Sequence, residues 1–203
     1  MSFSCHNTET QDMPDRSQTV AAPAALPFVY PLDDFYARAG LPLPATERIQ
    51  GEEMPEPYRS LLVHERDMTP TLEKFHGSNI HLKILKREQR GDFYFREVVL
   101  QLDGSEMPVE FGANKVSLVL FPPRARQLIL DERAPLGRIL KECEIGHTTV
   151  AKAFFRVAPD ELISSVLHLK TPAPLYGRKA TIFDAQKRPL SEIVEILPPS
   201  QAR

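Results

Sequence analysis

Apolar and polar residues alternate along residues 80–86 and 93–102, a pattern typical of half-buried β-strands. The Gln-Arg-Gly-Asp segment between these two stretches predicts a hairpin turn. A longer alternating stretch, residues 107–121, follows the turn signal Asp103-Gly104 and ends at two prolines. Further strands are expected at residues 148–157, 178–183 and 189–197, the last two joined around a turn at 184–187.

Helical spacing occupies the segments between these strands. Residues 56–75 predict two short helices, the second with Thr69 as its N-cap, Pro70 in its first turn and Gly77 just past its end. Residues 124–130, 135–143 and 159–169 predict further helical pieces. Strand pairs joined by tight turns, with helices grouped between them, predict an α+β fold with a mostly antiparallel sheet.

The apolar pattern becomes regular only near residue 28. Residues 1–27 are rich in Ser, Thr, Pro, Ala, Gln and Asp, which predicts a disordered N-terminal arm. Residues 28–203 are expected to form a single domain, because 203 residues suit one domain with a tail.

Composition narrows the classes of function. The net charge of −2 gives no electrostatic case for nucleic acid or an anionic membrane, and no apolar run reaches the ~20 residues that span a bilayer. The N-terminus lacks the basic start and apolar stretch of a secretory signal. Two cysteines, Cys5 and Cys143, make no disulfide framework, so a reduced, cytoplasmic protein is expected.

Several catalytic and metal-binding motifs are absent: GxGxxG, the P-loop, HExxH and GxSxG. The six histidines are scattered without metal-ligand spacing, so we expect no metal and no cofactor. His64 and His147 are candidate site residues, although a surface or capping histidine is the commoner role.

Arg96 stands out because it interrupts an apolar row. If residues 93–102 form a strand, its face carries Tyr94, Val98, Leu100 and Leu102. A buried guanidinium without a negative partner is costly, so it needs a carboxylate. Two partners remain open: an internal salt bridge, for instance to Glu110, or a ligand carboxylate gripped by two parallel hydrogen bonds.

Six segments, in order, resemble the chorismate lyase family: LLVHERDMTPTLE, YFREVVLQLDG, EFGANKV, APLGRIL, LYGRKATI and RPLSEIVEILPP. The resemblance runs from about residue 61 to residue 199. It implies a six-stranded antiparallel sheet whose ligand lies buried beneath helical flaps. It also implies a carbon–oxygen lyase that eliminates pyruvate from chorismate, giving 4-hydroxybenzoate for ubiquinone biosynthesis without metal or cofactor.

The resemblance also implies roles for individual residues. Arg96 matches the arginine that binds the ring carboxylate, and the backbone amide of Met68 meets the same carboxylate. Leu136 and Gly137 match the loop whose backbone N–H meets the ring hydroxyl. Gly112 matches a glycine at a position where a side chain would crowd the ligand.

A glutamate on the last strand completes the family site, and two residues compete for this role. Glu192 and Glu195 lie on opposite faces of the strand by parity, and Glu195 is preferred as the catalytic carboxylate. The sequence departs from the family at Ala113, where an arginine is usual, and Lys115 is a candidate to replace the lost charge.

Two other functions remain open. One is a related enzyme that converts chorismate to another hydroxybenzoate. The other is a non-catalytic small-molecule-binding module like the UTRA effector domains of bacterial regulators, because fold does not fix function. Such regulators normally carry an N-terminal DNA-binding helix-turn-helix, for which residues 1–55 show too little helical pattern and too few basic residues. In each case the expected partner is a small aromatic or cyclic carboxylate, and the oligomeric state stays undetermined.

Overall fold

The alternating stretches of the sequence form an antiparallel β-sheet in the computed structural model, which describes residue 1, residues 28–171 and residues 173–199. Its seven strands run in the order β1-β5-β6-β7-β4-β3-β2, and every neighbouring pair is antiparallel. The strands are β1 (Thr46–Ile49), β2 (Ile80–Arg90), β3 (Phe93–Leu102), β4 (Pro108–Ser117), β5 (His147–Val157), β6 (Leu175–Asp184) and β7 (Pro189–Leu197). The α+β prediction is therefore confirmed.

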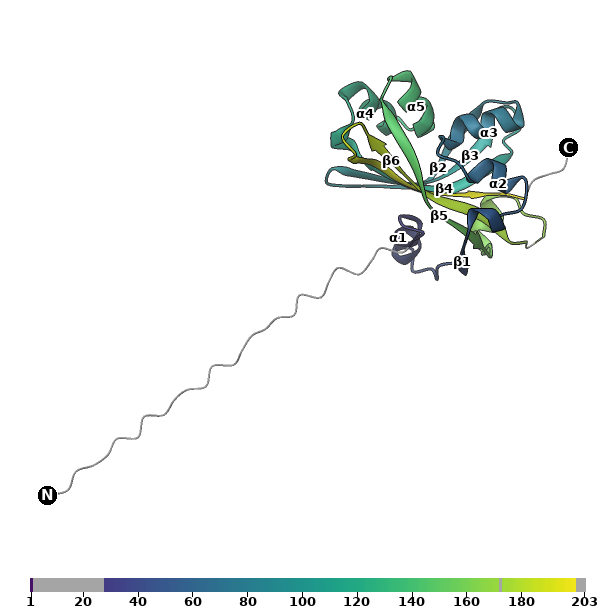
Figure 1. The fold of residues 1–203 in the computed structure, drawn as a ribbon, viewed down its shortest axis with the longest axis horizontal. Coiled ribbons are helices and arrows are strands. Elements are labelled where there is room, and N and C mark those ends of the chain that lie inside the picture. Colours follow the sequence, from purple (N-terminus) through teal and green to yellow (C-terminus); the bar gives the residue numbers. More distant parts are fainter. Residues whose placement is uncertain (2–27, 172, 200–203) are drawn as a thin grey trace.

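Helices lie on both faces of the sheet (Figure 1). They are α1 (Leu32–Arg38), α2 (Tyr58–Leu62), α3 (Met68–His76), α4 (Pro123–Leu130), α5 (Leu136–Glu142) and α6 (Glu161–Val166). Helices α2 to α5 lie on one side of the sheet and α1 on the other (Figure 1). We call α2–α3 the first flap and α4–α5 the second flap.

The two faces of the sheet bury different cores. On the face of α1 and α6, Phe95, Phe111 and Val194 pack against Leu32 and Ile163. On the opposite face, two smaller apolar clusters lie beneath the second flap and the first flap. The second face is therefore divided between two helix pairs, and the seam between them is where a cavity forms.

Local signals explain most element boundaries. Gly91 and Gly104 adopt positive φ angles of 55° and 79° in the two predicted turns, a conformation that glycine takes without strain. Gly77 ends α3 in the left-handed region, as expected. Asp160 caps α6 by accepting a hydrogen bond from the Ile163 backbone N–H at 2.8 Å.

The expectation of about six strands is confirmed, with one further edge strand, β1, which is four residues long and half-exposed. Two details of the prediction were wrong. Helix α3 begins at Met68 after Asp67, so Thr69 lies inside its first turn and is not the N-cap. The stretch 107–121 leaves the sheet after Ser117 and continues as a 3-10 turn at Leu118–Leu120.

The domain boundary stays a prediction, because residues 2–27, where the N-terminal arm was placed, lie outside the described residues. Cys5 lies there as well, while Cys143 is a free, half-buried thiol. None of the helices in the described segments is long and apolar enough to cross a bilayer.

Candidate functional site

A small cavity lies between the sheet and the first turns of the two flaps. Its volume is about 40 Å³, enough for a few water molecules. The sheet contributes side chains from β2 to β7, and the flaps contribute the starts of α3 and α5. The lining residues are Asp67, Met68, Thr69, Leu82, Arg96, Val98, Leu100, Glu110, Asn114, Pro135, Leu136, Gly137, Thr149, Ile182, Ile193 and Glu195.

Arg96 reaches this cavity from the middle of β3, where it pairs with Asn114 of β4. The residue is only 1% exposed, and its Nε and Nη1 atoms have no hydrogen-bond partner among the described residues. Burial lowers the pKa of the guanidinium to about 10, and the charges of Tyr94 and Glu132 offset this only in part. Arg96 therefore stays positively charged at neutral pH and presents unpaired N–H groups to the cavity.

The described residues do not form the internal salt bridge that the sequence left open. Within the described part of the chain no carboxylate lies within 4 Å of the Arg96 guanidinium nitrogens. Glu132 is the acidic residue whose charge acts on Arg96, but its carboxylate is held by Tyr94 and Arg87. Among the described residues Arg96 thus has no direct carboxylate partner, and Glu132 acts on it only from beyond salt-bridge distance.

Glu195 faces the same cavity but already has a partner. Its Oε2 accepts a hydrogen bond from Arg178 Nε of β6 at 2.5 Å, and both side chains are buried. Arg178 also donates to the backbone carbonyls of His64 at 2.9 Å and Arg66 at 3.0 Å. This arginine therefore joins the centre of the sheet to the loop between α2 and α3.

Glu192 lies on the opposite face of the sheet, as strand parity requires. Its carboxylate pairs with Lys115 at 3.2 Å and Lys179 at 3.5 Å. Ala113 also faces away from the cavity, within the core beneath α1 and α6. Neither Ala113 nor Lys115 therefore lies beside Arg96, and the expected compensation between them has no geometric basis.

Residues named from the flaps do meet at the cavity. Met68 is the first residue of α3, and Leu136 and Gly137 are the first residues of α5. A Cβ on Gly137 would lie 3.4 Å from Thr69 Oγ1, an ordinary van der Waals contact, so the two helix starts lie side by side and a small side chain would be tolerated at this position.

Gly112 does not line the cavity, and the reason for a glycine there differs from the one expected. A Cβ at this position would lie 2.2 Å from the backbone oxygen of Val194 on the neighbouring strand. Gly112 pairs directly with Glu195. Its lack of a side chain therefore serves the close approach of β4 and β7 beside that carboxylate.

His147 fastens the first flap to strand β5. Its Nε2 lies 2.9 Å from Asp67 Oδ2 and its Nδ1 lies 2.7 Å from the Ile145 carbonyl oxygen, while Thr149 donates to Asp67 Oδ1 at 2.6 Å. Burial opposes the imidazolium, but these acceptors outweigh it and raise the pKa of His147. His147 is therefore a positioning residue, with Asp67 as its counter-ion.

His64, the other histidine singled out from the sequence, is in the neutral state. Its Nδ1 lies 3.2 Å from Arg178 Nη1 and accepts from the Arg66 backbone N–H at 3.1 Å. Burial and the charge of Arg178 lower the pKa of His64 to about 4, so the ring is neutral at pH 7. His64 thus helps to seat Arg178 and does not itself line the cavity.

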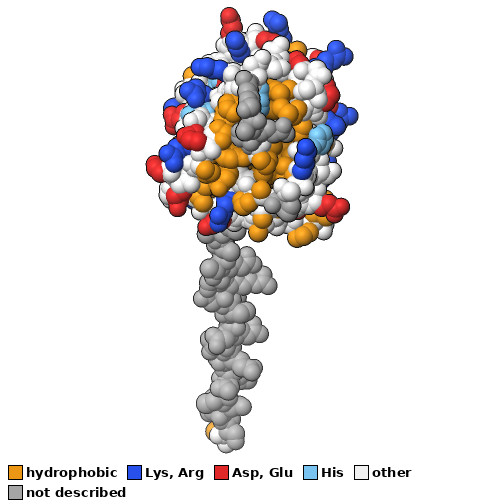
Figure 2. All heavy atoms as spheres, turned by 90° about the vertical axis from the view of Figure 1, so that its right-hand side faces the viewer, with side chains coloured by type: hydrophobic (Ala, Val, Ile, Leu, Met, Phe, Trp, Pro, Cys, Tyr) orange, Lys and Arg blue, Asp and Glu red, His pale blue; other side chains and the backbone are white. Residues whose placement is uncertain are grey.

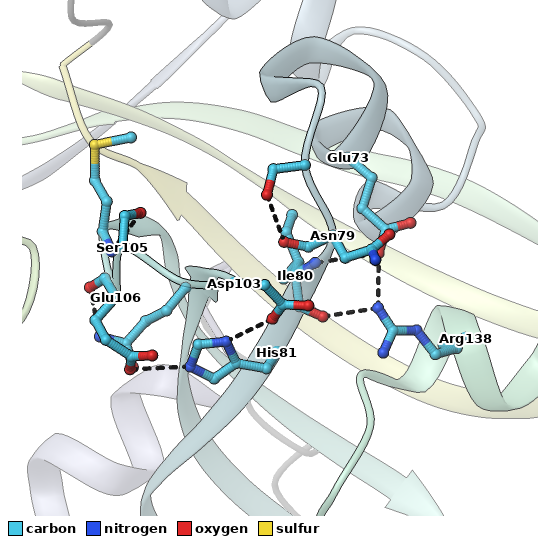
Figure 3. Close-up of polar contacts among 11 residues, drawn as sticks. Glu73, Asn79, Ile80, His81, Asp103, Ser105, Glu106 and Arg138 are labelled. Carbon is cyan, nitrogen blue, oxygen red and sulfur yellow. Dashed lines mark hydrogen bonds and ion pairs between the residues drawn. The ribbon is translucent and has the colours of Figure 1, made fainter.

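A third tie links the two flaps to each other (Figure 3). Arg138 of α5 donates to Glu73 of α3 at 2.7 Å and to the Ile80 carbonyl at 2.8 Å. On the same strand, His81 lies between Asp103 and Glu106, at 2.9 and 3.1 Å (Figure 3). The helices that cover the cavity are therefore held in place by several specific contacts.

Two residues of this site were missed from the sequence, Arg178 and Glu110. Arg178 carries the same signal as Arg96, since it interrupts the apolar row of Ala180 and Ile182 on its strand. Glu110 is 5% exposed and lies opposite Leu100 of β3. Sequence reasoning considered it only as a salt-bridge partner of Arg96, which it is not.

A second hollow lies near the end of β7 and has a volume of about 1270 Å³. Figure 2, drawn from the side of α3, shows apolar side chains gathered over this region. Its walls include Leu61, Leu72, Leu102, Met107 and Leu197. None of the buried side-chain atoms that lack a hydrogen-bond partner among the described residues belongs to it. The smaller cavity therefore carries the stronger mark of a polar ligand site.

No grouping of three or more His, Cys, Asp or Glu side chains in the described ranges could hold a metal ion. The candidate site thus consists of one unpaired cation, buried carboxyl groups and apolar walls.

Comparison with known proteins identifies the fold. No family model and no curated protein matches the chain. Among solved structures, the effector domain of PhnF from Mycobacterium smegmatis matches 66% of this chain and 88% of its own, with 16% identity and a TM-score of 0.52. The longer PhnF structure matches 68% of this chain at the same identity and TM-score, and this chain covers 65% of its length. A GntR-family transcriptional regulator from Bacillus cereus matches with 11% identity and a TM-score of 0.44.

The PhnF match shows a UTRA-like effector-domain fold. It contradicts the predicted enzyme, because the matched structures are regulator effector domains. The assignments as a carbon–oxygen lyase, as a chorismate-converting enzyme and as a step of ubiquinone biosynthesis were therefore wrong. A fold of this kind also serves binding without catalysis.

Proposed function

We propose that the chain is a non-catalytic binding module that takes a small aromatic or cyclic carboxylate at Arg96. The observation that carries this proposal is the buried guanidinium whose Nε and Nη1 atoms have no partner among the described residues. A planar guanidinium can hold a carboxylate by two parallel hydrogen bonds, one from Nη2 and the other from Nε or Nη1. A ligand carboxylate would supply the negative partner that Arg96 lacks among the described residues.

The surroundings of Arg96 support this role. Glu195 is engaged by Arg178, so it does not compete with a ligand for the guanidinium. Val98, Leu136 and Ile193 supply apolar walls suited to a ring. A site closed to water strengthens each polar contact inside it.

The flap residues complete the proposed site. The backbone N–H of Met68 belongs to the first turn of α3, where helix N–H groups lack partners within the helix. We assign it to the same ligand carboxylate as Arg96. Leu136 and Gly137 of the second flap would contact the far end of the ligand, beside Glu195.

A cavity of about 40 Å³ is too small for a ring, so binding requires a flap to move away from the sheet. The likeness to an effector domain fits such a response, because ligand entry would change the position of α3 or α5. We also propose that this small carboxylate is the partner of the protein and that the protein is cytoplasmic.

Isothermal titration of the full chain with benzoate tests the proposal. We expect saturable one-site binding that weakens at least about tenfold in Arg96→Met, which keeps the length of the side chain but removes its donors. Arg124→Met is the matched control, because Arg124 is exposed on α4. Equal binding by the wild type and Arg96→Met would overturn the assignment.

A further inference from the structure

Glu110 is the other buried ionisable group that faces the cavity without a partner. Its Oε2 atom has no hydrogen-bond partner in the described part of the chain, although the residue is only 5% exposed. An unpaired polar atom in such a place is costly unless a ligand or water satisfies it. This is the same mark that singles out Arg96.

Strand register places Glu110 and Arg96 at opposite ends of the cavity. Arg96 pairs with Asn114 of β4, and Glu110 precedes Asn114 by four residues on the same strand. At the rise of an extended strand, the Cα atoms of Glu110 and Asn114 lie about 13 Å apart, and Arg96 lies beside Asn114 on the next strand. Glu195 lies between them on β7, opposite Gly112. The two unpaired groups therefore face a ligand from its two ends.

The remaining charges of the cavity cancel in pairs. Glu195 is neutralised by Arg178, and Asp67 by His147. Burial raises the pKa of the Glu110 carboxyl well above its ordinary value, the charge of Glu195 raises it further, and Arg178 opposes this only in part. When Glu110 is neutral, Arg96 is the one described lining residue whose charge is not balanced by an opposite charge beside it.

Building on the proposed function, we infer that Glu110 is a specificity-determining residue that donates a hydrogen bond to the end of the ligand remote from Arg96. The ligand class is then a small monocarboxylate with a neutral hydrogen-bond acceptor opposite its carboxylate. A second carboxylate is disfavoured, because no second unpaired cation lines the described cavity.

Three probes that share one ring and one carboxylate separate these requirements: benzoate, 4-carbamoylbenzoate and benzene-1,4-dicarboxylate. The carbamoyl group offers a neutral acceptor, and the second carboxylate has nearly the same shape but carries a charge. We expect the wild type to bind 4-carbamoylbenzoate about tenfold more tightly than either of the other two. In Glu110→Leu the preference for 4-carbamoylbenzoate over benzoate should vanish. In Glu110→Gln, whose side chain can still donate a hydrogen bond, this preference should persist.

Glu192→Leu is the control, because Glu192 lies on the other face of the sheet. Infrared spectra of the unliganded protein give an independent readout: a protonated carboxyl band at neutral pH should disappear in Glu110→Gln. Benzoate binding that depends on Arg96, with an unchanged preference in Glu110→Leu, would overturn this inference and leave the proposed function standing. Tighter binding of the dicarboxylate would overturn the monocarboxylate class. Absence of binding by all three probes would overturn the proposed function and this inference together.

Discussion

Two arginines lie on the same face of the sheet, and their surroundings differ. Arg178 donates to Glu195 and to the carbonyls of the α2–α3 loop, so its donors are used within the protein. Arg96 is equally buried, yet two of its nitrogens lack partners among the described residues. The first side chain is suited to hold the structure together, and the second is suited to receive a ligand.

Stability measurements should separate these two roles. Arg178→Met leaves the Glu195 carboxylate buried without its partner, so we expect it to lower the free energy of unfolding by about 3–5 kcal/mol. Arg96→Met removes a buried guanidinium that has no carboxylate within 4 Å, so stability should stay unchanged or rise. Urea denaturation of both variants checks this, and a larger loss in Arg96→Met would contradict the assignment.

His64 gives the protein a predictable sensitivity to acid. Its pKa is about 4 in the folded state and 6.5 in the reference state, so the unfolded chain binds the proton more readily. The stability due to His64 is therefore complete above pH 6.5 and is lost as the pH falls towards 4. We expect His64→Gln to lose less stability than the wild type across this window in urea titrations. Parallel pH profiles for the two proteins would refute the neutral state assigned to His64.

At the scale of elements, short helices are held over the cavity by side-chain contacts. Helix α3 has nine residues and α5 has seven, lengths at which helices depend on tertiary contacts for stability. Asp67 ties α3 to β5, and Arg138 ties α5 to α3 and β2. These polar contacts add to the apolar packing of the two clusters that lie beneath the flaps.

Removing one tie should loosen the first flap selectively. In Arg138→Met, Glu73 loses its cation, and we expect faster amide hydrogen exchange in residues 68–76 with little change in β3, β4 and β7. Hydrogen-exchange mass spectrometry measures both regions in one experiment, with Arg124→Met as the surface control. Uniform acceleration across the sheet would show that Arg138 supports the whole fold instead of the flap.

The sequence predicted these elements well where the signal was local. The hairpin of β2 and β3 and the left-handed end of α3 follow from alternation and from Gly91 and Gly77. The first residue of α3 was misplaced because Thr69 and Asp67 are both suitable capping residues, and only the backbone distinguishes them. Strand β1 was missed because four half-exposed residues at a sheet edge carry little periodicity.

At the scale of the whole molecule, the site is assembled from distant parts of the chain. Arg96, Glu110 and Glu195 come from three neighbouring strands, β3, β4 and β7, and the flaps bring Met68 and Leu136 over them. Arg96 could be singled out from the sequence because one strand suffices to show its anomaly. The place of Glu110 could not, because it depends on the register of β4 against β3 and on an adjacent irregularity at Leu100/Gln101.

Function was less accessible from the sequence than fold. The order of short motifs predicted an α+β sheet with a buried pocket, and the fold is confirmed by its geometry and by the PhnF comparison. The same motifs suggested a lyase, which the comparisons contradict. Motifs that build a cavity around an arginine specify what can bind there, whereas a reaction also depends on how the bound molecule is distorted and protonated.

A crystal structure of the chain with benzoate would show whether a ligand carboxylate meets Arg96 beneath the flaps. We predict the carboxylate within hydrogen-bond distance of the Arg96 guanidinium, the ring between Val98 and Leu136, and α3 or α5 displaced from the sheet. Benzoate bound only in the large apolar hollow at the end of β7, with Arg96 still unpaired, would contradict the assignment of Arg96 as the ligand-binding residue.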